Sequence, residues 1–123
     1  MEFVGDPLRL ARALEDLSAQ FARALPGRLA EIQEEYAALL RSPGDRQALE
    51  RMRARVHKLA GSGTTFGFAA LSQESLDLED HIKRLASREE PLPLADVQAL
   101  GPRLSLVRRA ALGPLGTDPE SGD

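Results

Sequence analysis

The sequence predicts an all-α fold: an antiparallel four-helix bundle of up-down-up-down topology with an additional N-terminal helix. Three observations favour it. The chain has 123 residues, a length that suits one compact domain with its own core. Leu and Ala dominate the apolar set, whereas the residues typical of strands are few, with four Val, two Ile and three Thr. Apolar residues also recur at steps of three and four along most of the chain.

The first predicted helix runs from about Asp6 to Ala24. Asp6 can cap it, and Pro7 suits the first helical position. A second helix is predicted from Pro26 to about Leu40, where the apolar periodicity resumes. Because Pro26 can either end one helix or kink a continuous one, the sequence leaves open whether these are two helices or a single kinked rod.

Two further helices are predicted on either side of Gly67. The first follows a turn that ends at Asp45, which can cap it. In both helices the apolar positions step by three and four, over 49–66 in the first and 68–85 in the second. A period near 3.5 with a break of a residue or two predicts antiparallel neighbours packed like a coiled coil.

The last predicted helix spans about residues 94–111. Gly101 and Pro102 lie inside it and should kink or split it. Residues 113–123 have no periodicity and are predicted to form a disordered tail, which leaves a domain of residues 1–112. We expect the last four helices to form the bundle and the first to pack against one end or side of it.

The composition argues against several classes of protein. Without cysteine, disulfide frameworks and thiolate metal sites are excluded. The formal charge is −3, and three acids but no bases lie in the last eleven residues, so the rest of the chain is neutral, unlike a nucleic-acid-binding surface. No apolar run approaches the roughly 18 residues of a membrane span, and the N-terminus does not resemble a signal peptide. We therefore expect a cytoplasmic protein that binds neither nucleic acid nor membranes.

Familiar catalytic motifs are absent. The glycine-rich stretch 61–67 follows a helix and lacks the lysine of a nucleotide-binding loop. Neither histidine has a Glu three residues before it, as di-iron carboxylate bundles require: Ala54 precedes His57 at that spacing, and Leu78 precedes His81. No serine lies in the G-x-S-x-G motif of hydrolases. We expect no metal, no cofactor and no ATP-binding site.

His57 is the candidate nucleophile. At about 100° per residue it lies well off the apolar stripe centred between Val56 and Leu59, and it should be exposed. Gly61 follows one turn later on the same face, although glycine in a helix costs about 1 kcal/mol relative to alanine. The glycine would leave a notch through which a partner reaches the imidazole. Alternatively, Gly61 and Gly63 allow close helix packing or mark a fraying helix end.

Two cations accompany this histidine. Arg53 lies one turn before His57, and Lys58 follows it directly. Cations at these positions would stabilise a phosphoryl group carried on the imidazole nitrogen. The alternative is that they belong to an ordinary solvated basic face.

His81 is a weaker candidate. It follows Glu79 and Asp80 on the next helix, where we expect the two acids to cover the polar face. A solvated or ion-paired histidine is therefore predicted there, with no second site.

A longer pattern spans the two middle helices. It consists of His57-Lys-Leu-Ala-Gly-Ser-Gly-Thr-Thr-Phe-Gly67, followed by Leu71 and Leu78-Glu79. This pattern resembles histidine-containing phosphotransfer (HPt) domains, whose motif is approximately H-x-L-K-G-[SA]-x-x-x-x-G with a leucine four residues on and a leucine-acid pair late in the next helix. The match covers about residues 45–85. It departs at Ala60, where the family usually has the phosphate-stabilising lysine.

The resemblance implies a four-helix bundle in which His57 is phosphorylated and Gly61 lets the partner approach. Lys58 or Arg53 would substitute for the missing lysine. The imidazole would take a phosphoryl group from the aspartate of a response-regulator receiver domain, or from a sensor histidine kinase, and pass it to another receiver aspartate. Because the receiver supplies the metal ion and most of the catalysis, the chain would be a phosphocarrier and not an enzyme.

The resemblance also implies a docking face around His57, on the flank of the second and third predicted helices, with or without the first. The small residues Ala54, Ala60 and Gly61 would let a receiver helix pack closely against it. We expect a monomer that binds its partners transiently. Two alternatives remain open: an inactive HPt-like bundle that binds a partner without carrying phosphate, and the phosphotransfer segment of a larger chemotaxis-type or hybrid kinase.

Overall fold

The computed structural model describes residues 6–113, and this part of the chain is helical without strands. The all-α prediction is therefore confirmed. The helices are α1 (Pro7–Arg41), α2 (Arg46–Thr65), α3 (Ala69–Ala86), α4 (Leu94–Gln98) and α5 (Leu100–Leu112). None of the helices in this part of the chain is long and apolar enough to cross a membrane.

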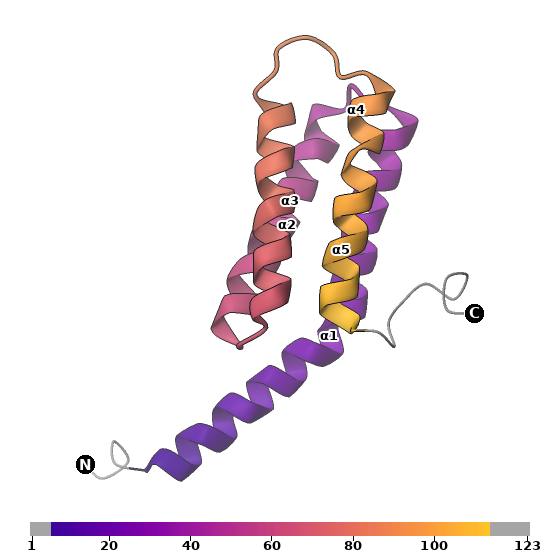
Figure 1. Ribbon diagram of the computed structural model, residues 1–123. Coiled ribbons are helices and arrows are strands. Elements are labelled where there is room, and N and C mark those ends of the chain that lie inside the picture. Colours follow the sequence, from indigo (N-terminus) through magenta and orange to yellow (C-terminus); the bar gives the residue numbers. More distant parts are fainter. Residues whose placement is uncertain (1–5, 114–123) are drawn as a thin grey trace.

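α1 is a single helix, which answers the question that the sequence left open. Its N-cap is Asp6, whose carboxylate accepts a hydrogen bond from the backbone N–H of Arg9 at 3.0 Å. Pro26 lies inside the helix, and Figure 1 shows the helix axis changing direction where the first half meets the rest of the molecule. A proline inside a helix removes a backbone hydrogen bond and is a usual cause of such a kink.

The second half of α1 groups with α2, α3 and α5, and these four segments alternate in direction (Figure 1). They are called the bundle below. α2 packs against α1 on one side and α3 on the other, and α3 also packs against α5. The core contains, among others, Leu25, Ile32, Leu39, Leu49, Met52, Val56, Leu59, Leu71, Leu78, Ile82, Leu100 and Val107.

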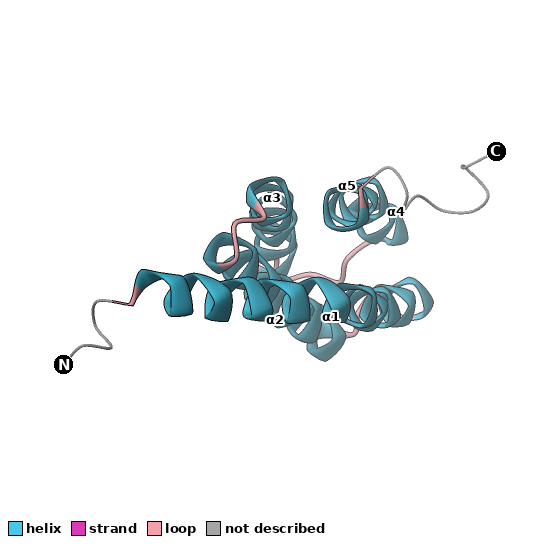
Figure 2. Cartoon of the chain, turned by 90° about the horizontal axis from the view of Figure 1, so that it is seen from below, coloured by secondary structure: helices cyan, strands magenta, loops and turns pink. Residues whose placement is uncertain are grey.

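The first half of α1 does not pack as we expected. Residues 7–20, called the arm below, project beyond the bundle (Figures 1 and 2). Four leucines of the arm are between 46% and 62% exposed, namely Leu8, Leu10, Leu14 and Leu17. Phe21, the residue that follows the arm, reaches the core, where its ring packs against Phe66 and Phe68. The prediction of an additional N-terminal helix packed on the bundle is therefore wrong. Its residues form the first half of α1, and the kink directs them away from the bundle.

The C-terminal helix breaks at Ala99, two residues before the predicted break at Gly101. α4 ends before Ala99 and α5 starts at Leu100, so Pro102 lies in the first turn of α5. A proline is tolerated there because the first four N–H groups of a helix have no intrahelical acceptor. A Cβ at Gly101 would come within 2.9 Å of the Tyr36 hydroxyl, so glycine lets α1 and α5 approach. Burial raises the pKa of Tyr36, whose hydroxyl donates a hydrogen bond to a backbone carbonyl before α5.

The predicted disordered tail lies outside the described residues except for Gly113. This residue follows α5 with φ of +68°, in the left-handed region that glycine tolerates, and its N–H donates to the carbonyl of Arg109 at 2.8 Å.

Candidate functional site

His57 lies on the outer face of α2, and its side chain is 68% exposed. The neighbouring Val56 and Leu59 are buried in the core at 0% and 1% exposure. This contrast follows from the helical period, which places residue 57 about 100° from residue 56. The predicted exposure of the histidine is therefore confirmed.

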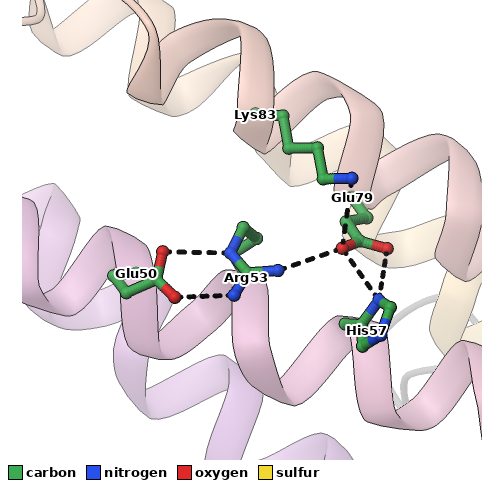
Figure 3. A network of polar contacts seen from close by, with 5 residues as sticks. All are labelled: Glu50, Arg53, His57, Glu79 and Lys83. Atoms are coloured by element: carbon green, nitrogen blue, oxygen red, sulfur yellow. Dashed lines mark hydrogen bonds and ion pairs between the residues drawn. The ribbon is translucent and has the colours of Figure 1, made fainter.

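The ring of His57 is oriented by a buried carboxylate of α3. Its Nδ1 lies 3.1 Å from Oε1 and 3.0 Å from Oε2 of Glu79, which is only 3% exposed (Figure 3). A carboxylate can only accept hydrogen bonds, so the Nδ1 of His57 is the donor and carries the proton. In the neutral imidazole, Nε2 then holds the free lone pair.

Two cations compensate the buried carboxylate. Nη1 of Arg53 lies 3.2 Å from Oε2 of Glu79, and Nζ of Lys83 lies 3.7 Å from the same oxygen (Figure 3). Partners of this kind are required, because a buried charge without them costs several kcal/mol. The site thus combines one histidine, one carboxylate and two cations drawn from facing helices.

Arg53 is held in place from both sides. Its Nε and Nη2 donate to the two carboxylate oxygens of Glu50 at 3.0 and 2.6 Å, in addition to the bond with Glu79. The hydrogen bonds with Glu50 are the largest cause of a raised pKa for Arg53 and, in return, of a lowered pKa for Glu50. The guanidinium is therefore permanently charged and fixed one turn from His57.

The prediction that Glu79 covers the polar face of its helix is wrong. Glu79 faces α2, together with the buried Ser72 and Ser75, whereas Asp80 is exposed as expected. The three buried polar residues are spaced by three and four, which is the period of a helix face. This spacing, together with the leucine-acid pair of the family pattern, could have predicted that Glu79 is buried.

The two glycines of α2 serve different purposes. A Cβ at Gly61 would meet nothing within 4 Å, whereas a Cβ at Gly63 would lie 3.3 Å from the backbone nitrogen of Ser72. The close-packing explanation therefore applies to Gly63, which lets α2 and α3 approach. Gly61 is exposed one turn after His57, where it leaves open space and has no packing need.

The predicted partner-contact residues Ala54 and Ala60 are in different environments. Ala54 is exposed on α2, but Ala60 is only 3% exposed. The carbonyl of Ala60 accepts hydrogen bonds at 3.1 Å from the hydroxyls of Thr64 and Ser72. The interpretation of Ala60 as a surface for partner approach is wrong, because residue 60 faces α3.

Lys58 lies apart from the carboxylate network. It lines a groove of about 330 Å³ between α1 and α2, together with Arg28, Glu31 and Arg55. Of the two cations predicted to stabilise phosphate, the structure therefore joins only Arg53 to the network around His57. Lys83, which the sequence analysis did not single out, joins the network from α3.

His81 is half-buried, so it is less solvated than predicted, and among residues 6–113 it forms no ion pair. Within the described residues its Nδ1 is buried and has no hydrogen-bond partner. Burial lowers the pKa of His81, and the positive charges of Arg84 and Arg103 lower it further, against the opposing effect of Asp96. Among residues 6–113 no group of three His, Asp or Glu side chains is placed to hold a metal ion.

Comparison with known proteins gives one family. The model of the Hpt domain family matches residues 9–110, a range that includes every residue of the site and all but the last two residues of the bundle. Neither the curated proteins nor the solved structures give a significant match.

Proposed function

Because the chain belongs to the Hpt domain family, whose members carry phosphoryl groups on histidine in two-component phosphorelays, we propose that His57 is its phosphoacceptor. The group is taken from the aspartyl phosphate of a receiver domain, or from a sensor histidine kinase, and passed to another receiver aspartate. The observation that carries this proposal is the geometry of the imidazole, with Nδ1 held by Glu79 and the other nitrogen on an exposed face.

The transfer step uses this geometry directly. Nε2 attacks the phosphorus of the acyl phosphate, the N–P bond forms as the P–O bond to the aspartyl carboxylate breaks, and the electron pair leaves with that carboxylate. Nδ1 keeps its proton and continues to donate it to Glu79. The carboxylate thereby stabilises the positive charge that develops on the ring. Transfer to the next receiver is the reverse reaction with a new aspartate.

The surroundings of His57 support the same step. Arg53 and Lys83 lie on the Glu79 side of the ring, where they compensate the charge of the buried carboxylate and hold it in position to accept from Nδ1. Gly61 and Ala54 leave the outer face of α2 open for a docking receiver. The chain supplies a nucleophile and a docking surface, so it acts as a phosphocarrier and not as an autonomous enzyme.

The test follows intact mass while the protein is incubated with a panel of phosphorylated receiver domains. We expect the addition of one phosphoryl group that is labile in acid and stable in base, in the wild type and in a His81→Gln control, but absent from His57→Gln. If no receiver transfers to the wild type, the chain is an inactive helical interaction module. If His57→Gln is still labelled, the assignment of the acceptor is wrong.

A further inference from the structure

The arm carries an apolar stripe that no other part of residues 6–113 covers, and this stripe points to a partner. Leu10, Leu14 and Leu17 are spaced by four and three and share one face of α1. The stripe ends at Phe21, about 16 Å further along the helix axis from Leu10. Small residues flank the stripe, namely Ala11, Ala13 and Ser18. A leucine face with small flanks is the kind of surface on which another amphipathic helix packs closely.

The stripe is linked through Phe21 and Arg28 to the groove that Lys58 lines. Phe21 packs against Phe66, and the hydroxyl of Ser18 donates to the Phe66 carbonyl at 3.3 Å, so the arm is fixed beneath the α2–α3 connection. The guanidinium of Arg28 lies over the Phe21 ring at 5.6 Å, and Arg28 lines the same groove as Lys58. Lys58 is the residue after the proposed acceptor. Both views of the chain show the arm extending past α2 and α3, on the side away from α5 (Figures 1 and 2).

The groove adds charge to this surface. Within the described residues, Arg28 and Lys58 form no ion pair, whereas Arg55 is matched by Glu31 and Glu35. The groove therefore presents two cations without an ion pair, one over the Phe21 ring at the base of the arm and one next to His57 in the sequence. Cations at such a rim attract an acidic partner and guide its approach.

We propose that the arm and the groove extend the His57 face into one docking surface for the receiver domain that exchanges phosphoryl groups with it. The partner's amphipathic helix packs on Leu10, Leu14 and Leu17, and acidic side chains of the partner face Arg28 and Lys58. This inference rests on the proposed function and assigns the arm a role in affinity, at a distance from the chemistry.

A second copy of the chain fits the surface less well. It would cover the leucines, but it would bring its own Arg28 and Lys58 toward the same region. The charged residues of the arm, such as Arg12 and Asp16, lie on the face opposite the leucines, so they supply no complementary contacts between two arms.

The experiment measures transfer from a phosphorylated receiver over a range of receiver concentrations. In the variant Leu10→Glu/Leu14→Glu we expect the half-saturating concentration to rise by about tenfold or more, with the rate at saturation within twofold of wild type. The matched control, Arg12→Gln/Ala19→Glu, makes the same change in charge on the opposite face of the arm and should leave both quantities unchanged. Far-UV circular dichroism checks that both variants keep their helix content.

Three results would overturn the inference. In the first, the leucine variant has the half-saturating concentration of wild type. In the second, the control variant weakens transfer as much as the leucine variant, so that charge alone is responsible. In the third, sedimentation shows a wild-type dimer that the leucine variant dissociates without any change in transfer, so that a second copy occupies the stripe. Complete absence of transfer to wild type would instead refute the proposed function, and this inference with it.

Discussion

The two histidines of the chain occupy opposite kinds of environment. His57 has an exposed ring whose Nδ1 donates to a buried carboxylate, whereas the Nδ1 of His81 is itself buried and has no partner within the described residues. In the first case the protein fixes one tautomer and leaves the other nitrogen accessible. In the second case burial and neighbouring arginines disfavour the charged ring. The proposed acceptor therefore combines an exposed ring with a buried hydrogen-bond partner, a combination that His81 lacks.

The largest expected effect comes from removing the charge of the buried partner. In Glu79→Gln the amide oxygen can still accept from Nδ1 of His57, but the negative charge that stabilises the phosphorylated ring is gone. We expect the rate of phosphoryl transfer at saturating receiver to fall by roughly ten- to a hundredfold. Rapid-quench measurement of the phosphorylated fraction checks this. A rate within twofold of wild type would show that Glu79 only fills space.

A smaller effect is expected from the cations, and it separates Arg53 from Lys58. Arg53→Gln removes a direct partner of Glu79 and should slow transfer by about three- to tenfold at saturation. Lys58→Gln removes a cation of the groove and should mainly raise the half-saturating concentration of receiver and weaken its dependence on salt. The two variants make the same change in charge, so equal effects on the saturating rate would contradict the assignment of separate roles.

Sequence reasoning predicted the features that helical period alone determines. The exposure of His57, the α2–α3 pair and the turn around Gly67 all follow from counting positions along one helix. Glu79 was misplaced because its burial depends on the histidine and cations that meet it from another helix. The free arm was also missed, because Leu10, Leu14 and Leu17 have the pattern of a packed helix. Periodicity predicts that a face is covered and does not say whether the same chain covers it.

The environment of His81 predicts a loss of stability in acid. Its pKa is lowered in the folded protein, so the unfolded chain binds the proton first as the pH falls. The stability associated with this group is therefore complete above the unfolded pKa of about 6.5 and is lost as the pH falls below it. A single proton limits the slope to about 1.4 kcal/mol per pH unit. Urea unfolding at pH 7.5 and pH 5.5 should show a smaller difference for His81→Leu than for wild type, and a difference of the same size would disprove this role.

The smallest expected effect distinguishes the two glycines of α2, and it links stability to docking. Gly61→Ala places a methyl group in open space, so the gain in helix propensity should stabilise the protein by about 0.5–1 kcal/mol. Gly63→Ala places the same group 3.3 Å from the backbone of Ser72, where α2 and α3 must separate slightly, and we expect it to be destabilising. Urea unfolding of both variants measures the difference. Suppose that Gly61→Ala both stabilises the protein and raises the receiver concentration needed for half-saturation. That pair of results would show that glycine at position 61 gives the receiver access to His57, because alanine there would make the folded chain more stable.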